Sequence, residues 1–596
     1  MKVKIVVALF ISIWFLLLVR IYYISVKSNA LYSQIAINNI IKTEDIPPLR
    51  GTIRDRNGKA LAVNKLGFAI EIAPHLSKKK MISTLDEEIR KIIKFFPEYK
   101  FEKLKKEYLK HDSPYLHKYI KVIRFLPYNE LIPYFADISL DDKIKIVPAS
   151  KRYYPYGELL SHVLGYVSKA NIKDVRNDSV ANLTGFIGKS AIEKYYNREL
   201  EGNAGIKVSE VSAYNKEIKL IKKIEPTKKN LVLNIDVELQ KYLSEIFKGK
   251  SGAIIVMNAK TGAILAAGSY PGFDPNKFVN GISYKEWAKI STDFNHPFTN
   301  KLINGLYPPG SIVKPGVALA FLESKFINKN TIFYDPGYIE LGKRKFRCWK
   351  KDGHGKVDIT KAIRESCDVY FYKGSLKVGI DKISEVLKRF GFGEKTGVDL
   401  SNESYGILPS REWKLKRYGK PWFRGETIIT SIGQGYFLVT PMQIAKYTAM
   451  LATGLEITPH FGYKIGDKII QYKPKSIFSK RDKRYLKTIR KAMYEVANSP
   501  HGTAVKYLHD CKVKLAAKTG TAQVVGIPQE EKKRMKENEL AYFKRSQAWL
   551  TTYGPYKNPQ YVVTVLVEHG GHGGSAAGGI VSKIFDKLLE LGYIKQ

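Results

Sequence analysis

Cysteine is scarce in this chain, with three among 596 residues. A scaffold held together by disulfides needs more, and an odd number leaves at least one thiol unpaired. Acidic residues are also few, because 56 Asp and Glu face 99 Lys and Arg for a formal net charge of +43. This charge fits either attraction to an anionic partner or a surface on which Lys is the default residue. The Lys residues are spread along the chain, which favours the second interpretation and gives no support to nucleic-acid binding.

An apolar run opens the sequence. It covers residues 5–26, interrupted by Arg20, and about 20 residues are enough to cross a bilayer core. No Ala-x-Ala-like site follows, which argues against a cleaved signal peptide. We predict a cytoplasmic tail at 1–4 and a single transmembrane signal anchor at 5–26. The flanking basic residues do not decide its orientation.

The rest of the chain is long enough for two or more domains, and its 44% apolar and 26% charged residues are ordinary for folded protein. Residues 27–229 alternate strand-like runs with charged segments. Arg50 to Gly58 reads as a strand ending in an Asn-Gly turn, and residues 79–110 have the spacing of exposed amphipathic helices. Catalytic residue types do not gather here, so we expect a spacer or a docking domain, with a boundary at 224–229.

Residues 230–596 have strand patterns at both ends and helices between them. The strand candidates are 230–235, 253–257, 263–267, 515–517, 548–553 and 562–568, and the helix candidates at the ends are 237–247 and 581–591. This order predicts one α+β domain whose antiparallel sheet is assembled from both ends of the segment.

Three short polar motifs occur in this second part. They are Ser311-Ile312-Val313-Lys314, Ser366-Cys367-Asp368 and Lys518-Thr519-Gly520. Each is weak alone in a Lys-rich chain. Together they supply a nucleophile, a neighbouring base, a hydroxyl relay and a cationic strand, which is the set needed for acyl transfer by serine without a histidine triad.

The first motif supplies the nucleophile. Pro308, Pro309 and Gly310 favour a rigid start to a helix whose first turn carries Ser311, with Lys314 on the same face. Lys serves as a base only when it is neutral, and we expect burial and a nearby Lys518 to lower the pKa of Lys314.

The other two motifs complete the site. We expect Ser366 to relay a proton, and Asp368 either to fix Lys314 or to accept a hydrogen bond from the substrate amide. Lys518 and Thr519 are expected to hold a terminal carboxylate on a strand where Gly520 lets the substrate backbone approach. The backbone N–H groups of Ser311 and Thr521 are the candidate oxyanion hole.

The three motifs resemble the Ser-x-x-Lys, Ser-x-Asn/Asp and Lys-Thr-Gly set of penicillin-binding proteins and serine β-lactamases. Further segments are similar to class B pedestals and to the elongation-type branch, the penicillin-binding protein 2 family. They are Arg50 to Gly58, Gly188 to Gly202, Cys348-Trp349-Lys350, Gly353-His354-Gly355, Asp368, Gly433-Gln434-Gly435 and Thr440-Pro441. The likeness covers nearly the whole chain.

The resemblance implies a fold and a reaction. It implies a pedestal or dimerisation domain at 27–229 and a transpeptidase domain at 230–596, an antiparallel sheet packed with helices. Ser311 then attacks the penultimate D-Ala of a stem pentapeptide and releases the last D-Ala, and a neighbouring stem amine resolves the acyl-enzyme into a cross-link. β-Lactams acylate the same serine.

The resemblance also implies a location and partners. It places a single-pass protein in the bacterial inner membrane with its body in the periplasm. The implied partners are a SEDS glycosyltransferase of the RodA type and an MreC-type scaffold, and no organic cofactor is implied.

A second group of residues has ligand chemistry. Cys348 and Cys367 bracket His354, and Asp335 lies just upstream, so two thiolates, an imidazole and a carboxylate are available for a structural zinc ion. A Cys348–Cys367 disulfide, or unconnected buried thiols, are the alternatives. The elongation-type resemblance supports the metal, which would pin the turn carrying Ser366.

Several alternatives remain at this stage. They are a division-type class B protein, a β-lactam sensor or hydrolase, a non-enzymatic scaffold and a bifunctional class A enzyme. His569 and His572 invite a metal interpretation, but a glycine-rich surface loop is favoured. Residues 525–547 form either a mobile lid or a disordered insertion.

Overall fold

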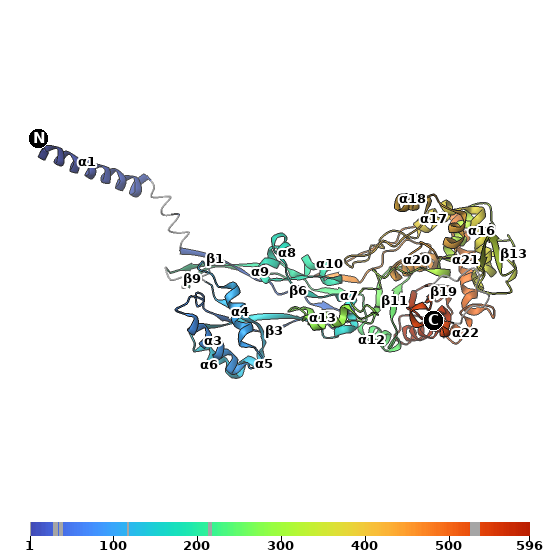
Figure 1. Ribbon diagram of the computed structural model, residues 1–596, viewed down its shortest axis with the longest axis horizontal. Helices are drawn as coiled ribbons and strands as arrows, with labels where there is room; N and C mark the ends of the chain where they lie inside the picture. Colours follow the sequence, from blue (N-terminus) through green and yellow to red (C-terminus); the bar gives the residue numbers. More distant parts are fainter. Residues whose placement is uncertain are drawn as a thin grey trace. The chain divides into compact units, whose positions relative to one another are not determined.

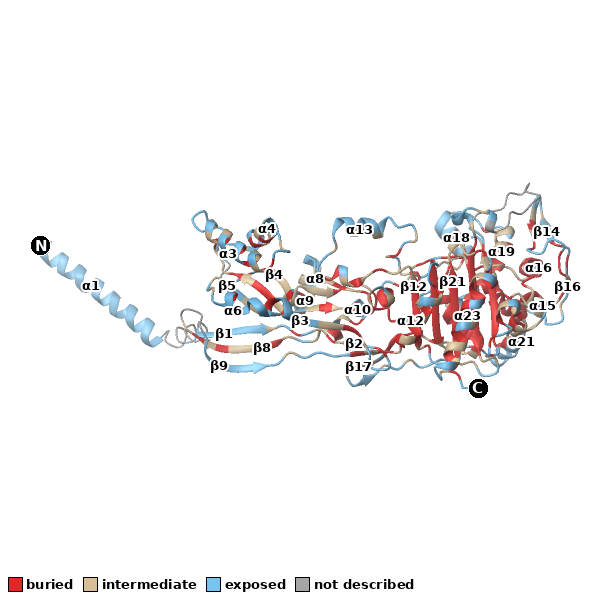
Figure 2. Cartoon of the chain, turned by 90° about the horizontal axis from the view of Figure 1, so that it is seen from below, coloured by how far each residue is buried: buried red, intermediate tan, exposed pale blue. Residues whose placement is uncertain are grey.

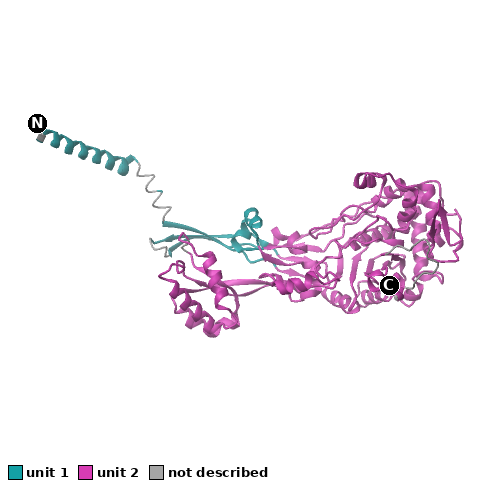
Figure 3. Cartoon of the chain, in the orientation of Figure 1, with its two compact units in different colours: residues 1–51, 170–186, 201–229 teal, residues 52–169, 187–200, 230–596 magenta. Residues whose placement is uncertain are grey.

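The computed structural model describes residues 2–27, 34, 40–115, 118–212, 217–524 and 537–595. The chain divides into two compact units, coloured separately in Figure 3. The first comprises residues 1–51, 170–186 and 201–229, and the second comprises 52–169, 187–200 and 230–596. The second unit therefore contains most of the predicted pedestal as well as the whole C-terminal region.

The first unit begins with helix α1 (Lys2–Tyr22), which continues as a π-helical turn over Tyr23–Lys27. Val3–Lys27 is the one segment in the described part of the chain that is long and apolar enough to cross a membrane. The unit also has an antiparallel sheet in the order β1 (Ile41–Ile46), β8 (Gly205–Val211), β9 (Glu217–Ile224). Every residue of β9 is exposed.

The second unit contains a seven-stranded sheet built from distant segments. Its strands are β2 (Ile53–Arg54), β3 (Ala60–Ile72), β4 (Ile120–Pro127), β5 (Ile144–Tyr153), β10 (Leu231–Leu233), β17 (Gly462–Ile465) and β18 (Lys468–Ile469). Helices α3 (Ile82–Phe95) and α4 (Phe101–His111) bury Leu85, Ile89 and Leu104 in a small separate core with strands β3 to β5. The predicted amphipathic helices of residues 79–110 are confirmed.

The main core surrounds a five-stranded antiparallel sheet (Figures 1 and 2). Its strand order is β12 (Ile264–Tyr270), β11 (Gly252–Asn258), β21 (Tyr561–Val567), β20 (Gln547–Gly554), β19 (Ala516–Ala522). Helices α12 (Val237–Ile246), α20 (Pro441–Thr453) and α23 (Gly573–Glu590) pack against it, which is why β21 reads as a continuous apolar run. The predicted α+β domain with a sheet from both chain ends is confirmed.

Helix α23 begins eight residues before the predicted start at 581. Its first turns contain glycines that lie before the predicted start. A side chain at Gly573 would lie 2.0 Å from the carbonyl oxygen of Trp549, and one at Gly578 would lie 2.4 Å from Tyr507. The glycines therefore allow this helix to pack closely against β20 and its neighbours.

The described residues contain further helices and short strands. The helices are α5 (Tyr128–Leu131), α6 (Phe135–Ser139), α7 (Ser161–Leu164), α8 (Ile172–Asn177), α9 (Ser179–Thr184), α10 (Ala191–Tyr195), α11 (Asn197–Glu201), α13 (Tyr284–Ser291), α14 (Lys314–Glu323), α15 (Ile359–Arg364), α16 (Asp368–Val378), α17 (Ile380–Arg389), α18 (Arg411–Tyr418), α19 (Arg424–Ser431), α21 (Lys480–Asn498) and α22 (Val505–Leu508). The short strands are β6 (Val167–Lys169), β7 (Phe186–Gly188), β13 (Phe333–Asp335), β14 (Tyr338–Leu341), β15 (Arg344–Arg347) and β16 (Gly355–Val357).

Candidate active site

Ser311 lies in a 3-10 turn, Gly310–Val313, that leads into α14. The sequence analysis placed it in the first turn of the helix itself. Helix α14 is buried over its whole length, so the turn is fixed to the core. Gly310 has a φ of +58° and donates its N–H to the carbonyl of Gly433 at 2.9 Å. A side chain at Gly310 would lie 3.0 Å from the carbonyl oxygen of Thr521, so the turn sits against strand β19.

Lys314 is fully buried and points at the second motif. Its Nζ lies 2.8 Å from Asp368 Oδ1, 2.8 Å from the carbonyl of Ser366 and 3.3 Å from Ser366 Oγ. Lys518, from strand β19, donates to the same Ser366 Oγ at 2.9 Å. Three motifs that span more than two hundred residues thus meet at one hydroxyl, which is the arrangement a proton relay requires.

Lys518 is the second lysine of the site. Burial, and after it the charge of Lys314, lower the pKa of Lys518 well below its ordinary value. A neutral amine in contact with Ser366 can accept a proton from that hydroxyl. Lys314 lies 2.8 Å from Asp368 Oδ1 in an ion pair.

Ser366 occupies the turn between α15 and α16 with a φ of +55°, in the left-handed region that a serine rarely adopts. Such a conformation costs about 1–3 kcal/mol and persists where the surroundings fix it, often at functional sites. Cys367 caps α16, because its Sγ accepts a hydrogen bond from Tyr370 N at 3.4 Å. The second carboxylate oxygen of Asp368 accepts from Trp349 N at 2.9 Å, which ties the 348–354 loop to the motif.

Strand β19 carries Lys518, Thr519 and Gly520 at one edge of the five-stranded sheet. An edge strand offers backbone groups to an extended peptide. A side chain at position 520 would lie 2.7 Å from Ile312 and 3.1 Å from the Pro309 carbonyl. Gly520 therefore makes room for the turn of Ser311. The Thr519 hydroxyl lies 2.7 Å from that of Thr503, a residue that no motif marked.

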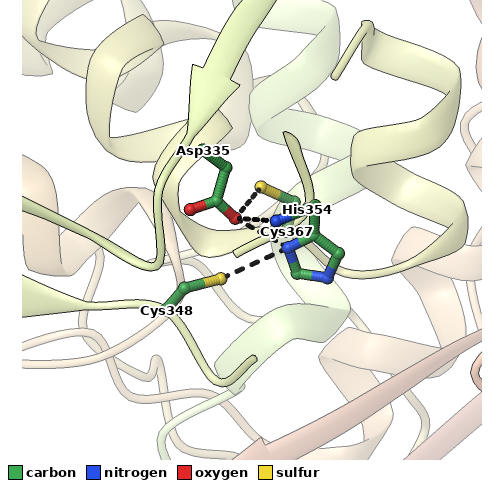
Figure 4. A group of neighbouring side chains, drawn as sticks. All are labelled: Asp335, Cys348, His354 and Cys367. Carbon is green, nitrogen blue, oxygen red and sulfur yellow. Dashed lines mark hydrogen bonds and ion pairs between the residues drawn. The ribbon is translucent and has the colours of Figure 1, made fainter. Parts of the chain in front are cut away.

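The four candidate metal ligands come together in the fold (Figure 4). Asp335 ends β13, Cys348 follows β15, His354 precedes β16, and Cys367 lies in the α15–α16 turn. All four are buried, and their ligand atoms lie within 4.8 Å of one another. His354 Nδ1 is 2.7 Å from Asp335 Oδ2 and 3.6 Å from Cys348 Sγ, and Cys367 Sγ is 3.2 Å from the same Asp335 oxygen.

The chemistry of this cluster fits a metal ion. Both cysteines are free thiols, and a hydrogen bond from Cys367 is the largest of the effects that lower the pKa of Cys348 to about 6, toward the thiolate form that binds metals. His354 directs Nδ1 at Asp335 and Cys348, and its other ring nitrogen points away from them (Figure 4). Two sulfurs, a nitrogen and a carboxylate oxygen form a zinc ligand set.

Other predicted features have different outcomes. No metal-ligand group in the described part of the chain includes His569 or His572, and the His569 ring packs 4.9 Å from Tyr542. Residues 525–536 of the predicted lid lie outside the described residues. In 537–547, the carboxylate of Glu537 accepts hydrogen bonds from the backbone and hydroxyl of Ser546.

The chain matches two protein-family models. The model "Penicillin binding protein transpeptidase domain" covers residues 252–590, and "Penicillin-binding Protein dimerisation domain" covers residues 45–233. The first match contains all three polar motifs, the predicted metal ligands and the five-stranded sheet. Together the matches cover most of the chain.

Relatives of known name agree with these matches. A peptidoglycan D,D-transpeptidase MrdA of Haemophilus influenzae is 36% identical over 96% of this chain and 89% of its own length. The structure titled as a complex between penicillin-binding protein 2 and MreC from Helicobacter pylori has a TM-score of 0.85 and 45% identity, and it covers 93% of this chain and 100% of that one. A structure titled as a peptidoglycan synthase complex has a TM-score of 0.71 and 26% identity over 100% of this chain and 99% of that one.

These likenesses extend over both predicted domains, and the relatives carry the name of the elongation-type branch rather than of the division-type branch or a hydrolase. The chain therefore belongs to the penicillin-binding protein 2 family, the elongation-type peptidoglycan D,D-transpeptidases.

Proposed function

We propose that Ser311 is the residue that carries the acyl group in this transpeptidase. The observation that supports this most strongly is the meeting of Lys314 and Lys518 at Ser366 Oγ, at 3.3 and 2.9 Å, beside the turn of Ser311. Strand β19 forms the neighbouring wall, where Lys518 and Thr519 hold the terminal carboxylate of the stem peptide. The N–H groups of Ser311 and Thr521 stabilise the oxyanion.

The reaction proceeds in two balanced steps. Ser311 Oγ forms a bond to the penultimate D-Ala carbonyl carbon, the bond from that carbon to the terminal D-Ala nitrogen breaks, and the hydroxyl proton reaches the leaving amine through the lysine and Ser366 relay. An amine of a neighbouring stem then bonds to the carbon, the ester bond breaks, and a proton returns to Ser311. A β-lactam opens its ring in the first step and stays attached.

Covalent labelling with a fluorescent penicillin tests this assignment. We expect the Ser311→Ala variant to lose labelling completely and the Ser291→Ala variant, which alters an exposed serine of α13, to label like the wild type. Mass spectrometry of the wild-type adduct should place the label on the peptide that contains Ser311. Labelling that persists in Ser311→Ala would contradict the proposal.

The buried Asp335, Cys348, His354 and Cys367 cluster holds a structural zinc ion in this proposal. The types of its four ligands and the closeness of their ligand atoms support the assignment. A zinc ion held by these four residues would fix the 335–354 segment to the turn of Ser366. Trp349, adjacent to Cys348, then keeps its hydrogen bond to Asp368, so the metal positions the relay without taking part in it.

Elemental analysis of the purified protein tests the metal. We expect one zinc per chain in the wild type and in Cys511→Ser, a matched buried cysteine outside the cluster, and little zinc in Cys367→Ser. Only trace zinc in the wild type, with a disulfide mapped between Cys348 and Cys367, would reject the site.

The apolar helix α1 anchors the protein in the bacterial inner membrane, with the remainder in the periplasm, where stem peptides are cross-linked. Its partners there are a RodA-type glycosyltransferase and an MreC-type scaffold. Two solved relatives, one a complex with MreC and one a peptidoglycan synthase complex, support these partners.

Co-purification of the tagged full chain from membranes tests the partners. Both should be enriched, by mass spectrometry, over an untagged control, and the Ser311→Ala variant should retain them. Failure to enrich either partner would contradict this part of the proposal. Degradation of the body by protease in spheroplasts but not in intact cells would place it in the periplasm, and full protection in spheroplasts would not.

A further inference from the structure

Lys301 is a buried cation that the reaction does not use. Lys301 is 2% exposed to solvent. Its Nζ lies within hydrogen-bond distance of four acceptors. They are Ser251 Oγ at 2.6 Å, the carbonyls of Tyr270 and Asn295 at 2.8 Å each, and Glu568 Oε2 at 2.7 Å. A buried ammonium ion persists only where such partners replace its water.

Glu568, which follows strand β21, is the charged partner. Its Oε2 also accepts the Ser251 hydroxyl, and its Oε1 accepts the hydroxyl of Tyr307 at 2.6 Å. Burial alone would raise the pKa of Glu568, but the charge of Lys301 holds it below the ordinary value, so the carboxylate stays ionised. Both carboxylate oxygens therefore have donors, and the cluster is closed.

Tyr307 connects this cluster to Ser311, four residues along the chain. Its backbone exchanges hydrogen bonds with Val439, at 3.0 Å from N to O and 2.9 Å in return. Its ring lies edge-on to Trp549 with centroids 6.0 Å apart, and Trp549 Nε1 donates to the Pro308 carbonyl at 3.1 Å. Pro308 and Pro309 restrict the backbone between Tyr307 and the turn, so a displacement of Tyr307 is passed on to Ser311.

The energetics argue against a purely stabilising role. Replacing a buried ion pair by apolar residues of similar volume is often neutral or stabilising, because the charges lose their hydration. Strands β11 and β21 around the cluster are otherwise almost entirely apolar. The ion pair holds the Glu568 carboxylate in one place. The Tyr307 hydroxyl therefore has one acceptor at one position, which fixes the orientation of the Tyr307 side chain.

We propose that Tyr307 is a positioning residue for acylation, held by Glu568 and Lys301, which fixes Ser311 relative to Ser366 and strand β19. None of the three residues contacts the reacting atoms. The inference rests on the proposed role of Ser311 as the acylated residue. Because a misplacement of about 1 Å costs about a hundred-fold in rate, a partial loosening should slow acylation about ten-fold while leaving inhibitor binding unchanged.

Stopped-flow labelling with a fluorescent penicillin separates the acylation rate constant from the dissociation constant of the preceding complex. Tyr307→Phe removes one hydroxyl and keeps the ring against Trp549. We expect its rate constant to fall about ten-fold with an unchanged dissociation constant. The control is Tyr553→Phe, which removes a buried hydroxyl of β20 that has no hydrogen-bond partner among the described residues, and it should match the wild type.

A second variant separates position from stability. In Lys301→Met/Glu568→Met the ion pair is gone, so thermal stability should stay close to the wild-type value while acylation slows as in Tyr307→Phe. The inference would be overturned if Tyr307→Phe were acylated as fast as the wild type. It would also be overturned if the double variant had both the stability and the acylation rate constant of the wild type. If the double variant does not fold, Tyr307→Phe decides alone. Labelling of Ser311→Ala would instead remove the proposed nucleophile, and the positioning role with it.

Discussion

Two buried polar clusters adjoin the turns that carry Ser311 and Ser366, and they are held together in different ways. Behind Ser311, Lys301 and Glu568 neutralise each other, and each charged group has its donors or acceptors within the protein. Next to Ser366, the cluster of Asp335, Cys348, His354 and Cys367 brings two thiols, an imidazole and a carboxylate within 4.8 Å of one another. The first cluster is complete within the chain, whereas the proposed role of the second depends on an ion that these four residues would hold.

Loss of a metal ligand should give the largest effect on this comparison. We expect His354→Ala to lose zinc and to acylate at least about a hundred-fold more slowly, because the Ser366 turn loses its attachment. Treatment of the wild type with a chelator should also slow labelling, while the Lys301→Met/Glu568→Met variant should respond to chelator in the same proportion. If His354→Ala protein without zinc were labelled as fast as the wild type, the position of the Ser366 turn would not depend on an ion.

Removing one charge from the Lys301 and Glu568 cluster should destabilise the protein. Lys301→Ala leaves Glu568 buried and unpaired, which costs about 3–5 kcal/mol of unfolding free energy. Urea unfolding measures this, with the double methionine variant as the control that should lose much less. Equal losses in the two variants would show that the ion pair stabilises the fold directly.

Acid should lower the unfolding free energy through His162, which lies close enough to Lys301 for that charge to act on it. Burial, and then the charge of Lys301, lower the pKa of His162 to about 4, so the folded protein keeps it neutral while an unfolded chain binds a proton near pH 6.5. The contribution is present above pH 6.5 and is lost as the pH falls to about 4, by up to about 3 kcal/mol.

Urea unfolding at pH 7, 5.5 and 4.5 measures this dependence. The slope should be smaller in His162→Gln and unchanged in His501→Gln, which alters an exposed histidine. Identical slopes in the wild type and His162→Gln would contradict it.

The smallest effect should come from Thr503, which belongs to neither cluster. Thr503→Val removes the hydroxyl that lies 2.7 Å from that of Thr519, a loss worth about 1 kcal/mol, or about five-fold in acylation. The same labelling assay measures it, with Thr503→Ser as the control that keeps the hydroxyl. A loss as large as that of Tyr307→Phe would place Thr503 among the positioning residues.

The candidate site was predictable where its residue types lie in short motifs. Asp335, Cys348, His354 and Cys367 fall within one segment of unusual ligand chemistry, so the sequence indicated them together. Ser251, Lys301, Tyr307 and Glu568 are spread over more than three hundred residues, and each is ordinary in its local context. Only the folded sheet, where the residue after β21 lies beside β11, brings them together.

The fold was predictable where hydrophobic patterns are long. The apolar runs of β11, β12 and β21 predicted the central sheet, and the spacing in residues 79–110 predicted α3 and α4. The pairing of β2 with β10, and of β10 with β17, was not predictable, because these strands have two to four residues and lie far apart in sequence. The left-handed conformation of Ser366 has no local sequence signal either, since a serine has no preference for it.

Asp368 has a further consequence for how chains with different middle motifs are to be compared. One of its oxygens accepts from the Lys314 ammonium and the other from the Trp349 backbone N–H. An asparagine has the same shape but offers a single oxygen, and its amide group would face one of these two donors with hydrogens of its own. A chain with asparagine at this position must therefore route the loop after its Cys348 equivalent elsewhere, or leave one donor to water.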